Sequence, residues 1–302
     1  MARLTVSHAF VPVPRPRDVV ELLKPITWFP PIWAFMCGVV SSGEAWGPRW
    51  PFILLGILLT GPLVCGTSQA VNDWFDRHVD AINQPDRPIP SGRIAGNWGL
   101  RIACAGSLIS LAAAALAGAW VFGATCLAVA AAWAYSAPPF RAKMSGIWGP
   151  GLVAISYEGL TWFTGASVMA GGLPSMPVLA VLLLYSLGAH GIMTLNDFKA
   201  VDGDRAMGIR SLPVTLGIAR AVRVACWVMA LPQLAVIAIL LSLGHVGAGA
   251  IVGALLAGQL ALMPRLIADP VGRTPWYNAT GTTLSVLGML VSALGLGGVL
   301  PI

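Results

Sequence analysis

Long apolar segments recur along the whole of this 302-residue chain, and they decide what it can fold into. Hydrophobic residues make up 57% of the sequence and charged residues only 10%, whereas a soluble domain has about 25% charged residues. A helix of about 20 apolar residues can cross the hydrocarbon core of a bilayer. The uninterrupted apolar runs exclude a membrane β-barrel, whose strands alternate apolar and polar residues. The sequence therefore predicts an all-α, polytopic membrane protein embedded in the lipid bilayer.

Asparagine, glycine, proline and charged residues divide the apolar sequence into nine predicted crossings. Their ranges are 26–42, 51–72, 98–117, 121–137, 149–170, 176–196, 219–242, 246–265 and 279–299. No apolar core with a small-residue cleavage site precedes the first crossing, so the start of the chain does not resemble a signal peptide. We expect residues 1–24 to form a short cytoplasmic tail and residues 25–302 to form a single transmembrane domain.

The basic residues predict the orientation of the chain. If the N-terminus is cytoplasmic, nine crossings place 17 of the 18 lysines and arginines in the cytoplasm and leave only Arg49 outside. Such a strong bias is typical of membrane proteins, whose cytoplasmic loops are rich in Lys and Arg. The same residues are spread over several short loops, so the net charge of +6 does not indicate nucleic-acid binding.

An acidic cluster, Asn72-Asp-Trp-Phe-Asp-Arg-His-Val-Asp80, ends the second apolar stretch. At about 100° per residue, Asp73, Asp76 and Asp80 fall within about 60° of one another on a helix, and Asn72 extends this face. Like charges four residues apart on a helix repel each other. The face therefore needs a cation, and we expect a metal ion as its partner.

A second cluster, Asn196-Asp-Phe-Lys-Ala-Val-Asp-Gly-Asp204, repeats the first with one carboxylate missing. The spacing pairs Asn196 with Asn72, Asp197 with Asp73, Asp204 with Asp80 and Ala200 with Asp76. The two clusters lie 124 residues apart, and each ends an even-numbered crossing. This pattern suggests two related four-helix units plus one further helix, with an axis along the membrane normal. If the helix continues, Asp202 lies about 140° from the Asp197 face, which leaves a site role and a solvated loop acid both open.

The two clusters together predict a metal-dependent site for a phosphate-bearing substrate. Mg²⁺, or Mn²⁺ in its place, commonly binds through a few carboxylates together with substrate phosphates. The candidate metal ligands are Asn72, Asp73, Asp76, Asp80, Asn196, Asp197 and Asp204, and the aspartates among them are the candidate catalytic residues. The candidate diphosphate-binding residues are Arg87, Tyr135, Arg141, Lys143, Arg205 and Arg210. Tyr135 could instead be an interfacial residue, and Arg141 and Lys143 could be positive-inside anchors.

Two ionisable residues lie inside predicted crossings and are candidates for an acceptor cavity. Glu158 is a functional candidate because acids are costly within a membrane. His190 lies within the sixth crossing, where a hydrogen bond between helices is an alternative role and ligation of a tetrapyrrole metal a weaker one. Glu158 also has a structural hydrogen-bonding role as its alternative. The five cysteines lie in apolar segments and are expected to be packing residues.

These motifs resemble the UbiA superfamily of intramembrane prenyltransferases, whose signature is a pair of aspartate-rich motifs on cytoplasmic helix ends. Four further segments are similar to its chlorophyll and bacteriochlorophyll synthase branch: Lys24-Pro-Ile-Thr-Trp28, residues 81–92, Tyr135-Ser-Ala-Pro-Pro139 and residues 196–208. The resemblance covers roughly residues 20–300. Many superfamily members carry an aspartate where this chain has Ala200, so the resemblance leaves a symmetric two-metal site in doubt.

The resemblance implies an ester-forming reaction. The propionate of a chlorophyllide or bacteriochlorophyllide would attack C1 of geranylgeranyl or phytyl diphosphate and release diphosphate, with Mg²⁺ bridging the diphosphate. The implied location is the photosynthetic intracytoplasmic membrane of a bacterium, with the site open to the cytoplasm. A prenyltransferase acting on a quinone precursor or on haem would keep the same metal site. A secondary transporter is disfavoured, because its acids lie near the bilayer midplane rather than at helix ends.

Overall fold

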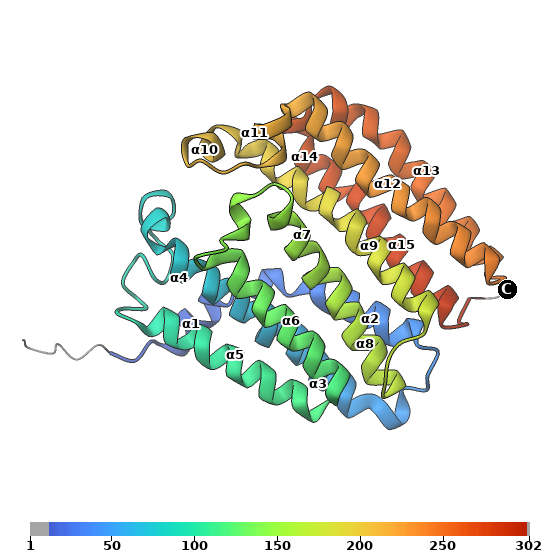
Figure 1. Cartoon of the computed structure of the whole chain (residues 1–302), viewed down its shortest axis with the longest axis horizontal. Helices are drawn as coiled ribbons and strands as arrows, with labels where there is room; N and C mark the ends of the chain where they lie inside the picture. Colours follow the sequence, from blue (N-terminus) through green and yellow to red (C-terminus); the bar gives the residue numbers. More distant parts are fainter. Residues whose placement is uncertain (1–11, 301–302) are drawn as a thin grey trace, which may run out of the picture.

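The computed structural model describes residues 12–300, and every regular element in that range is helical. Residues 1–11 of the predicted tail lie outside the described residues. Figure 1 shows the long helices side by side, most of them running along one common direction. Within residues 12–300 the all-α prediction is therefore confirmed, and a single isolated bridge joins Ser145 and Arg210.

The first half of the chain forms three long helical runs after two shorter helices. Pro62 interrupts the second apolar stretch, because proline lacks the N–H that an α-helix needs. The chain accommodates it in a wider π-helical segment, η3 (Leu59–Cys65), so that the helix continues without a break. The elements are α1 (Pro16–Leu22), α2 (Phe29–Ser41), α3 (Trp50–Leu58), α4 (Gly66–Asn83), α5 (Trp98–Leu116) and α6 (Ala119–Ser136).

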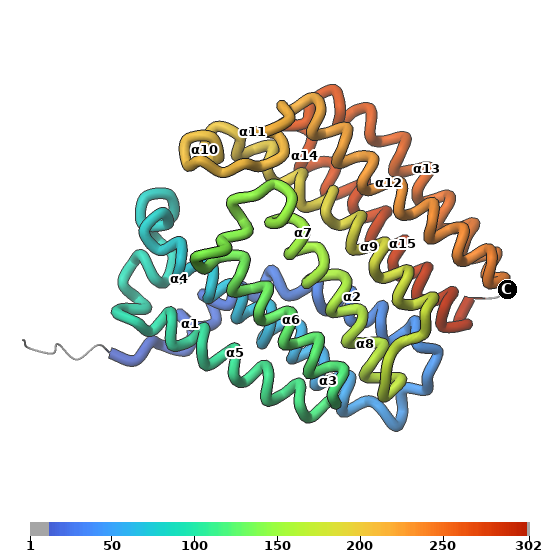
Figure 2. Tube along the Cα trace, viewed as in Figure 1, coloured from blue at the N-terminus to red at the C-terminus, as the bar shows by residue number. Residues whose placement is uncertain are grey.

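The second half begins with another helix that contains a π-helical segment, η5 (Ile155–Leu160), between α7 (Trp148–Ala154) and α8 (Thr161–Ala170). Figure 2 shows the chain passing from there through one long helix into short helices and loops before the last long helices. The remaining elements are α9 (Met176–Leu195), α10 (Val201–Ala206), α11 (Leu212–Leu216), α12 (Ile218–Ser242), α13 (Val246–Ala268), α14 (Pro270–Ala279) and α15 (Gly281–Leu296).

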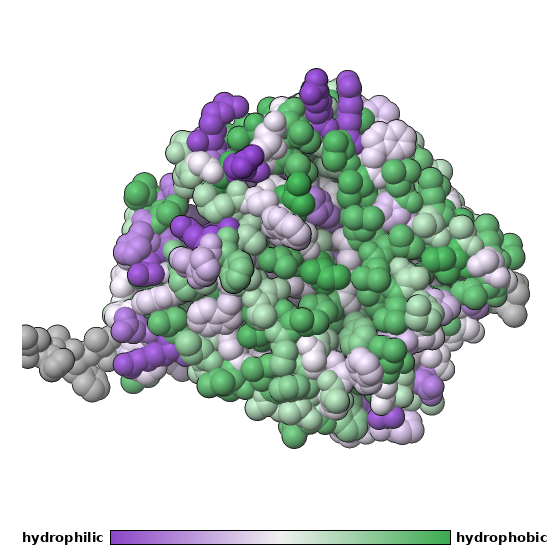
Figure 3. Space-filling view, viewed as in Figure 1, coloured by the Kyte–Doolittle hydropathy of each residue, from purple (hydrophilic) through white to green (hydrophobic). Residues whose placement is uncertain are grey.

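Seven helical runs within the described residues are long and apolar enough to cross a membrane. They are Gly47–Asn83, Trp98–Leu116, Ala119–Ser136, Met176–Lys199, Ile218–Ser242, Val246–Ala268 and Pro270–Leu296. The chain is therefore a multi-pass membrane protein. The other two predicted crossings coincide with α2, which has 13 residues, and with the run from α7 to α8. In Figure 3 hydrophobic residues cover the middle of the visible face, and most hydrophilic ones gather toward the ends of the helices.

Close helix contacts hold the two halves together. α9 packs along α12, and α2 packs along α8. At Gly165 of α8 a side chain would lie 2.9 Å from the Val39 backbone nitrogen of α2, so only glycine allows this approach. Trp162 of α8 stacks on Tyr185 of α9 with ring centroids 5.8 Å apart. These contacts fix the helix from α7 to α8 between the first and second halves.

The segment before the first crossing is attached to the end of α4. Leu22 is fully buried in a cluster with Ala70 of α4. Arg93, in the loop after α4, donates hydrogen bonds to Asp18 at 2.8 Å and to Glu21 at 2.5 and 2.6 Å. The hydrogen bond from Arg93 lowers the pKa of the Glu21 carboxyl. The described part of the predicted tail thus contributes to the end of the bundle that carries the first acidic cluster.

Candidate active site

The first acidic cluster lies in the last turns of α4, as the helical spacing predicted. Asp73 is 0% exposed and Asp80 is 7% exposed, whereas Asp76 is partly exposed. The Asn72 amide donates to Asp76 at 3.1 Å and to the Ser136 hydroxyl of α6 at 3.2 Å. α4 therefore presents two buried carboxylates and one more accessible carboxylate at the same end of the bundle.

Each carboxylate of the first cluster has a basic partner. Lys24 Nζ lies 2.7 Å from Asp73 Oδ1. Arg87 Nη1 lies 3.3 Å from Asp73 and 2.7 Å from Asp80, so one guanidinium serves both acids. The cation that the acidic face requires is thus supplied, for Asp73 and Asp80, by the chain itself.

Asp76 has a separate pair of partners on the loop after α6. Lys143 forms an ion pair with it, and Arg141 Nη2 lies 3.9 Å from the same oxygen. Burial lowers the pKa of Lys143, and the hydrogen bond to Asp76 opposes this effect. The structure therefore brings two predicted diphosphate-binding residues onto the most accessible carboxylate of α4.

Lys24 was missed as a site residue, although it begins the Lys24–Trp28 motif. It adopts a left-handed backbone conformation with φ of 47°, and Arg141 does so with φ of 40°. Among residues 12–300 these are the two non-glycine residues with positive φ. Such conformations cost about 1–3 kcal/mol each and cluster at functional sites. Both strained residues direct a charge to the first acidic cluster, and no sequence pattern signals that strain.

The second cluster is not one continuous helix. α9 ends at Leu195, a 3₁₀ turn, η6 (Asn196–Lys199), follows, and α10 begins after Ala200. Asp204 is buried, whereas the Asp202 side chain is fully exposed and lies 3.8 Å from Arg205. Of the two roles left open for Asp202, the exposure favours a solvated loop acid.

Asp197 remains without a basic partner. No hydrogen bond or ion pair within residues 12–300 involves its carboxylate. Tyr135, at the end of α6, lines one cavity together with Asn72 of the first cluster and with Met193, three residues before Asn196. The ends of α4 and α9, which carry the two clusters, lie at the same end of the bundle (Figure 1).

The loops of the two halves are joined by backbone hydrogen bonds. The Gly146 N–H donates to the Arg210 carbonyl at 2.8 Å, and the Arg210 N–H donates to the Met144 carbonyl at 2.9 Å. The Arg210 residue is exposed, and the Arg205 side chain is 66% exposed beside Asp202. Arg205 and Arg210 therefore lie at the solvent-exposed rim, apart from the buried ion pairs.

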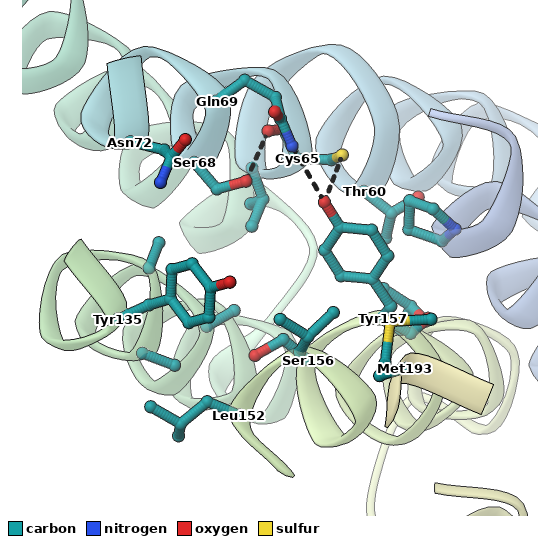
Figure 4. Close-up of a pocket in the computed structure, with 17 residues that line it drawn as sticks. Thr60, Cys65, Ser68, Gln69, Asn72, Tyr135, Leu152, Ser156, Tyr157 and Met193 are labelled. Carbon is teal, nitrogen blue, oxygen red and sulfur yellow. Dashed lines mark hydrogen bonds between the residues drawn. The ribbon is translucent and has the colours of Figure 1, made fainter. Parts of the chain in front are cut away.

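A cavity of about 330 Å³ lies next to Asn72 and Tyr135. Its lining is mostly apolar, and Figure 4 shows Gln69 and Cys65 on one side facing Tyr157 of η5 on the other. The Tyr157 hydroxyl accepts hydrogen bonds from Cys65 Sγ at 3.3 Å and from Gln69 Nε2 at 3.1 Å. The acidic end of the bundle is therefore continuous with an apolar space among the helices.

The donor set suits a hard divalent cation. No three His, Cys, Asp or Glu side chains in the described part of the chain converge on one point. Mg²⁺ does not require this, because it commonly keeps several waters and binds one or two carboxylates together with substrate phosphates. Asp73 Oδ2 is buried without a hydrogen-bond partner. This orphaned oxygen and the unpaired Asp197 are the oxygen ligands that such a cation prefers.

Neither acceptor candidate lines the cavity. His190 Nε2 lies 3.1 Å from the Ile147 carbonyl, so it joins α9 to the residue before α7, which matches its structural alternative. The Glu158 side chain, in η5, makes no hydrogen bond or ion pair among the described residues. The Glu158 carboxyl group is therefore free to bind a ligand.

Comparisons with known proteins identify the family of the chain. The model of the UbiA prenyltransferase family matches residues 28–296. The bacteriochlorophyll synthase 33 kDa chain of Cereibacter sphaeroides is 59% identical over 286 residues, which is 95% of each chain. The protein of the same name from Rhodobacter capsulatus is 53% identical over 289 residues, again 95% of each chain.

A solved structure supports the fold. The UbiA homologue from Archaeoglobus fulgidus, solved with GPP and Mg²⁺, has a TM-score of 0.68 and 20% sequence identity. The match covers 92% of this chain and 98% of that one. Together with the family match and the relatives, it confirms the resemblance stated from the sequence. The chain belongs to the UbiA prenyltransferase family.

Proposed function

We propose that this prenyltransferase is a bacteriochlorophyll synthase. It transfers a geranylgeranyl or phytyl group from the diphosphate to the propionate of a bacteriochlorophyllide or chlorophyllide. The observation that carries the proposal is the acidic end of α4, with its basic partners, beside an apolar cavity. The close relatives named bacteriochlorophyll synthase support this acceptor over a quinone precursor or haem.

The diphosphate binds between the two acidic clusters. The residues that would hold Mg²⁺ or Mn²⁺ there are Asn72, Asp73, Asp76, Asp80, Asn196, Asp197 and Asp204. Bound there, the cation would supply positive charge to the diphosphate and so make it a better leaving group. The orphaned Asp73 oxygen and the unpaired Asp197 support this assignment. The neighbour solved with GPP and Mg²⁺ supports divalent-metal binding in the family.

The basic residues beside Asp76 bind the outer diphosphate oxygens. Lys143 and Arg141 already lie at Asp76, and Arg87 lies at Asp80. They stabilise the negative charge that develops as the C1–O bond of the allylic donor breaks. The Tyr135 hydroxyl donates a hydrogen bond to the diphosphate. Arg205 and Arg210, at the solvent-exposed rim, attract the anionic substrate.

The chain does not need a general base for this reaction. A carboxylic acid is already ionised near pH 7, so the propionate oxygen attacks C1 directly while the bonding electron pair leaves with the diphosphate. The residues of the chain must instead orient C1 and exclude water, which would compete for the cationic carbon. The donor chain lies in the cavity beyond Asn72 and Tyr135, where the lining is apolar. Glu158 contributes to the acceptor side.

The site opens to the cytoplasm in the photosynthetic membrane of a bacterium. Nine crossings with a cytoplasmic N-terminus put both acidic clusters on that side, within one domain that spans residues 25–302. The strong bias of the basic residues supports this orientation.

The purified protein provides a direct test. It is incubated with bacteriochlorophyllide a or chlorophyllide a, each with geranylgeranyl or phytyl diphosphate, and the pigment ester is measured by chromatography. We expect an ester with at least one acceptor and donor, only when Mg²⁺ or Mn²⁺ is present. Ester formation that persists in excess chelator would contradict the metal assignment. Prenylation of a quinone precursor or haem, with neither chlorophyllide accepted, would contradict the acceptor assignment.

A further inference from the structure

The cavity beside the acidic clusters is elongated along the helices. On α4 and η3 its lining runs from Asn72 to Thr60, and on α6 it runs from Tyr135 to Ala128. Along the run from α7 to α8 it extends from Leu152 to Thr161. All three series lead away from the acidic end of the bundle. The cavity therefore forms a channel that begins beside the first acidic cluster and points away from it along the helices.

A second, much smaller cavity continues the same line. It measures about 20 Å³, and its deeper lining includes Ala124 and Leu160. Four residues line both cavities and form what we call the neck: Thr60, Val64, Ala128 and Thr161. The small cavity has room for about one water molecule. The usable channel therefore ends at the neck.

The neck is built from side chains that have their polar groups satisfied. The Thr60 hydroxyl donates to the Gly56 carbonyl at 2.9 Å, and the Thr161 hydroxyl donates to the Tyr157 carbonyl. Thr60 lies in η3, and Thr161 follows η5 directly. The two π-helical segments thus hold opposite walls of one constriction, and neither hydroxyl requires a partner from a ligand.

We infer that the neck sets the length of the donor chain that this enzyme accepts. The inference rests on the proposed function, because it takes the occupant of the channel to be the apolar chain of a prenyl diphosphate. The diphosphate fixes one end of the donor, so each added five-carbon unit advances the other end toward the neck. Packed interiors reject even a single excess methylene, so a fixed wall discriminates by length.

Ala128 is the position that tests the neck. Its side chain contacts both cavities, so a larger side chain there fills the channel at its inner end. Ala128→Phe should weaken the binding of geranylgeranyl diphosphate by about tenfold or more. It should weaken the binding of geranyl diphosphate by no more than about twofold. The readouts are the ligand-induced rise in Tm with Mg²⁺ present, and kcat/KM for each donor. Ala130→Phe adds the same bulk at an exposed position of α6 and should change neither donor.

A second variant tests the order along the channel. Ala124 lines only the small cavity, so Ala124→Phe should weaken the twenty-carbon donor less than Ala128→Phe and leave the ten-carbon donor unchanged. If Ala128→Phe does not fold, Ala128→Val and Ala124→Phe give the same comparison. Equal losses for both donors, or no change for either, would overturn the inference. An altered KM for the pigment alone would also overturn it, by placing the acceptor in the channel.

The Tm readout separates this inference from the proposed function. It reports donor binding without any acceptor. If the wild-type protein binds both diphosphates but esterifies no chlorophyllide, the proposed function fails while the length dependence of the variants still decides the role of the neck.

Discussion

At the residue scale, the first acidic cluster depends on cations from distant parts of the sequence. Asp73 has no exposed surface, and a buried carboxylate is costly unless it is paired. Lys24 and Arg87 both reach Asp73 Oδ1, and these partners lie 49 and 14 residues away in the sequence. The spacing of the aspartates indicated that a cation was required. It could not indicate Lys24, because that contact depends on how the segment before α2 folds back onto α4.

Loss of Lys24 should destabilise the folded protein. In Lys24→Met, Asp73 keeps only the Arg87 contact at 3.3 Å, so a buried charge becomes poorly compensated. We expect a loss of about 1–3 kcal/mol, measured as a lower Tm in detergent. Lys199→Met is the matched control, because Lys199 is exposed on η6. If Lys24→Met has the same Tm as the wild type, Arg87 alone compensates the charge of Asp73.

Carboxylates from both acidic clusters should be required for turnover, although they differ in exposure. We expect Asp73→Ala and Asp197→Ala each to lower turnover at least about tenfold, which corresponds to about 1.4 kcal/mol of transition-state stabilisation. Asp202→Ala should retain nearly full turnover, because that side chain is fully exposed and outside the buried cluster. Wild-type rates in Asp73→Ala or Asp197→Ala would refute a diphosphate site shared between the halves.

At the element scale, the sequence predicted the long helices well and their irregularities poorly. All nine predicted ranges are largely helical, and the α5 range differs by only one residue at its end. The π-helical segments η3 and η5 were not predicted, because apolar periodicity does not distinguish a wider turn from an α-helix. The break at Ala200 was also not predicted. A repeated spacing of aspartates is compatible with a continuous helix or with two short ones.

Gly146 controls how the loops of the two halves join. A side chain at this position would lie 2.7 Å from the Ser211 carbonyl carbon and 2.9 Å from the Arg210 oxygen, so the loops would have to separate. Lys143 belongs to the same loop and pairs with Asp76. We therefore expect Gly146→Ala to raise the donor KM several-fold, about one kcal/mol. Gly123→Ala, which meets no atom within 4 Å on α6, should behave as wild type. Equal KM values would show that the loop contact does not position Lys143.

At the scale of the whole molecule, the position of the two clusters bears on the number of crossings. Within the described residues, seven helical runs are long and apolar enough to cross a membrane, and neither α2 nor the run from α7 to α8 is among them. Yet Figure 1 shows the ends of α4 and α9, with α10, at the same end of the bundle. Clusters on one face require an even number of crossings between them. α5, α6 and α9 alone make three, so the proposed topology requires the run from α7 to α8 as the fourth crossing.

Reporter fusions test this topology. Green fluorescent protein folds in the cytoplasm, whereas alkaline phosphatase becomes active only outside it. With nine crossings, truncations fused after Gly92 and after Gly208 should both fluoresce, because both loops follow an acidic cluster on the cytoplasmic side. A fusion after Gly172, in the turn between α8 and α9, should show phosphatase activity. With only the seven long runs crossing, the loops at Gly92 and Gly208 would lie on opposite sides of the membrane. Phosphatase activity at either would therefore contradict nine crossings and separate the acidic clusters that the proposed diphosphate site requires.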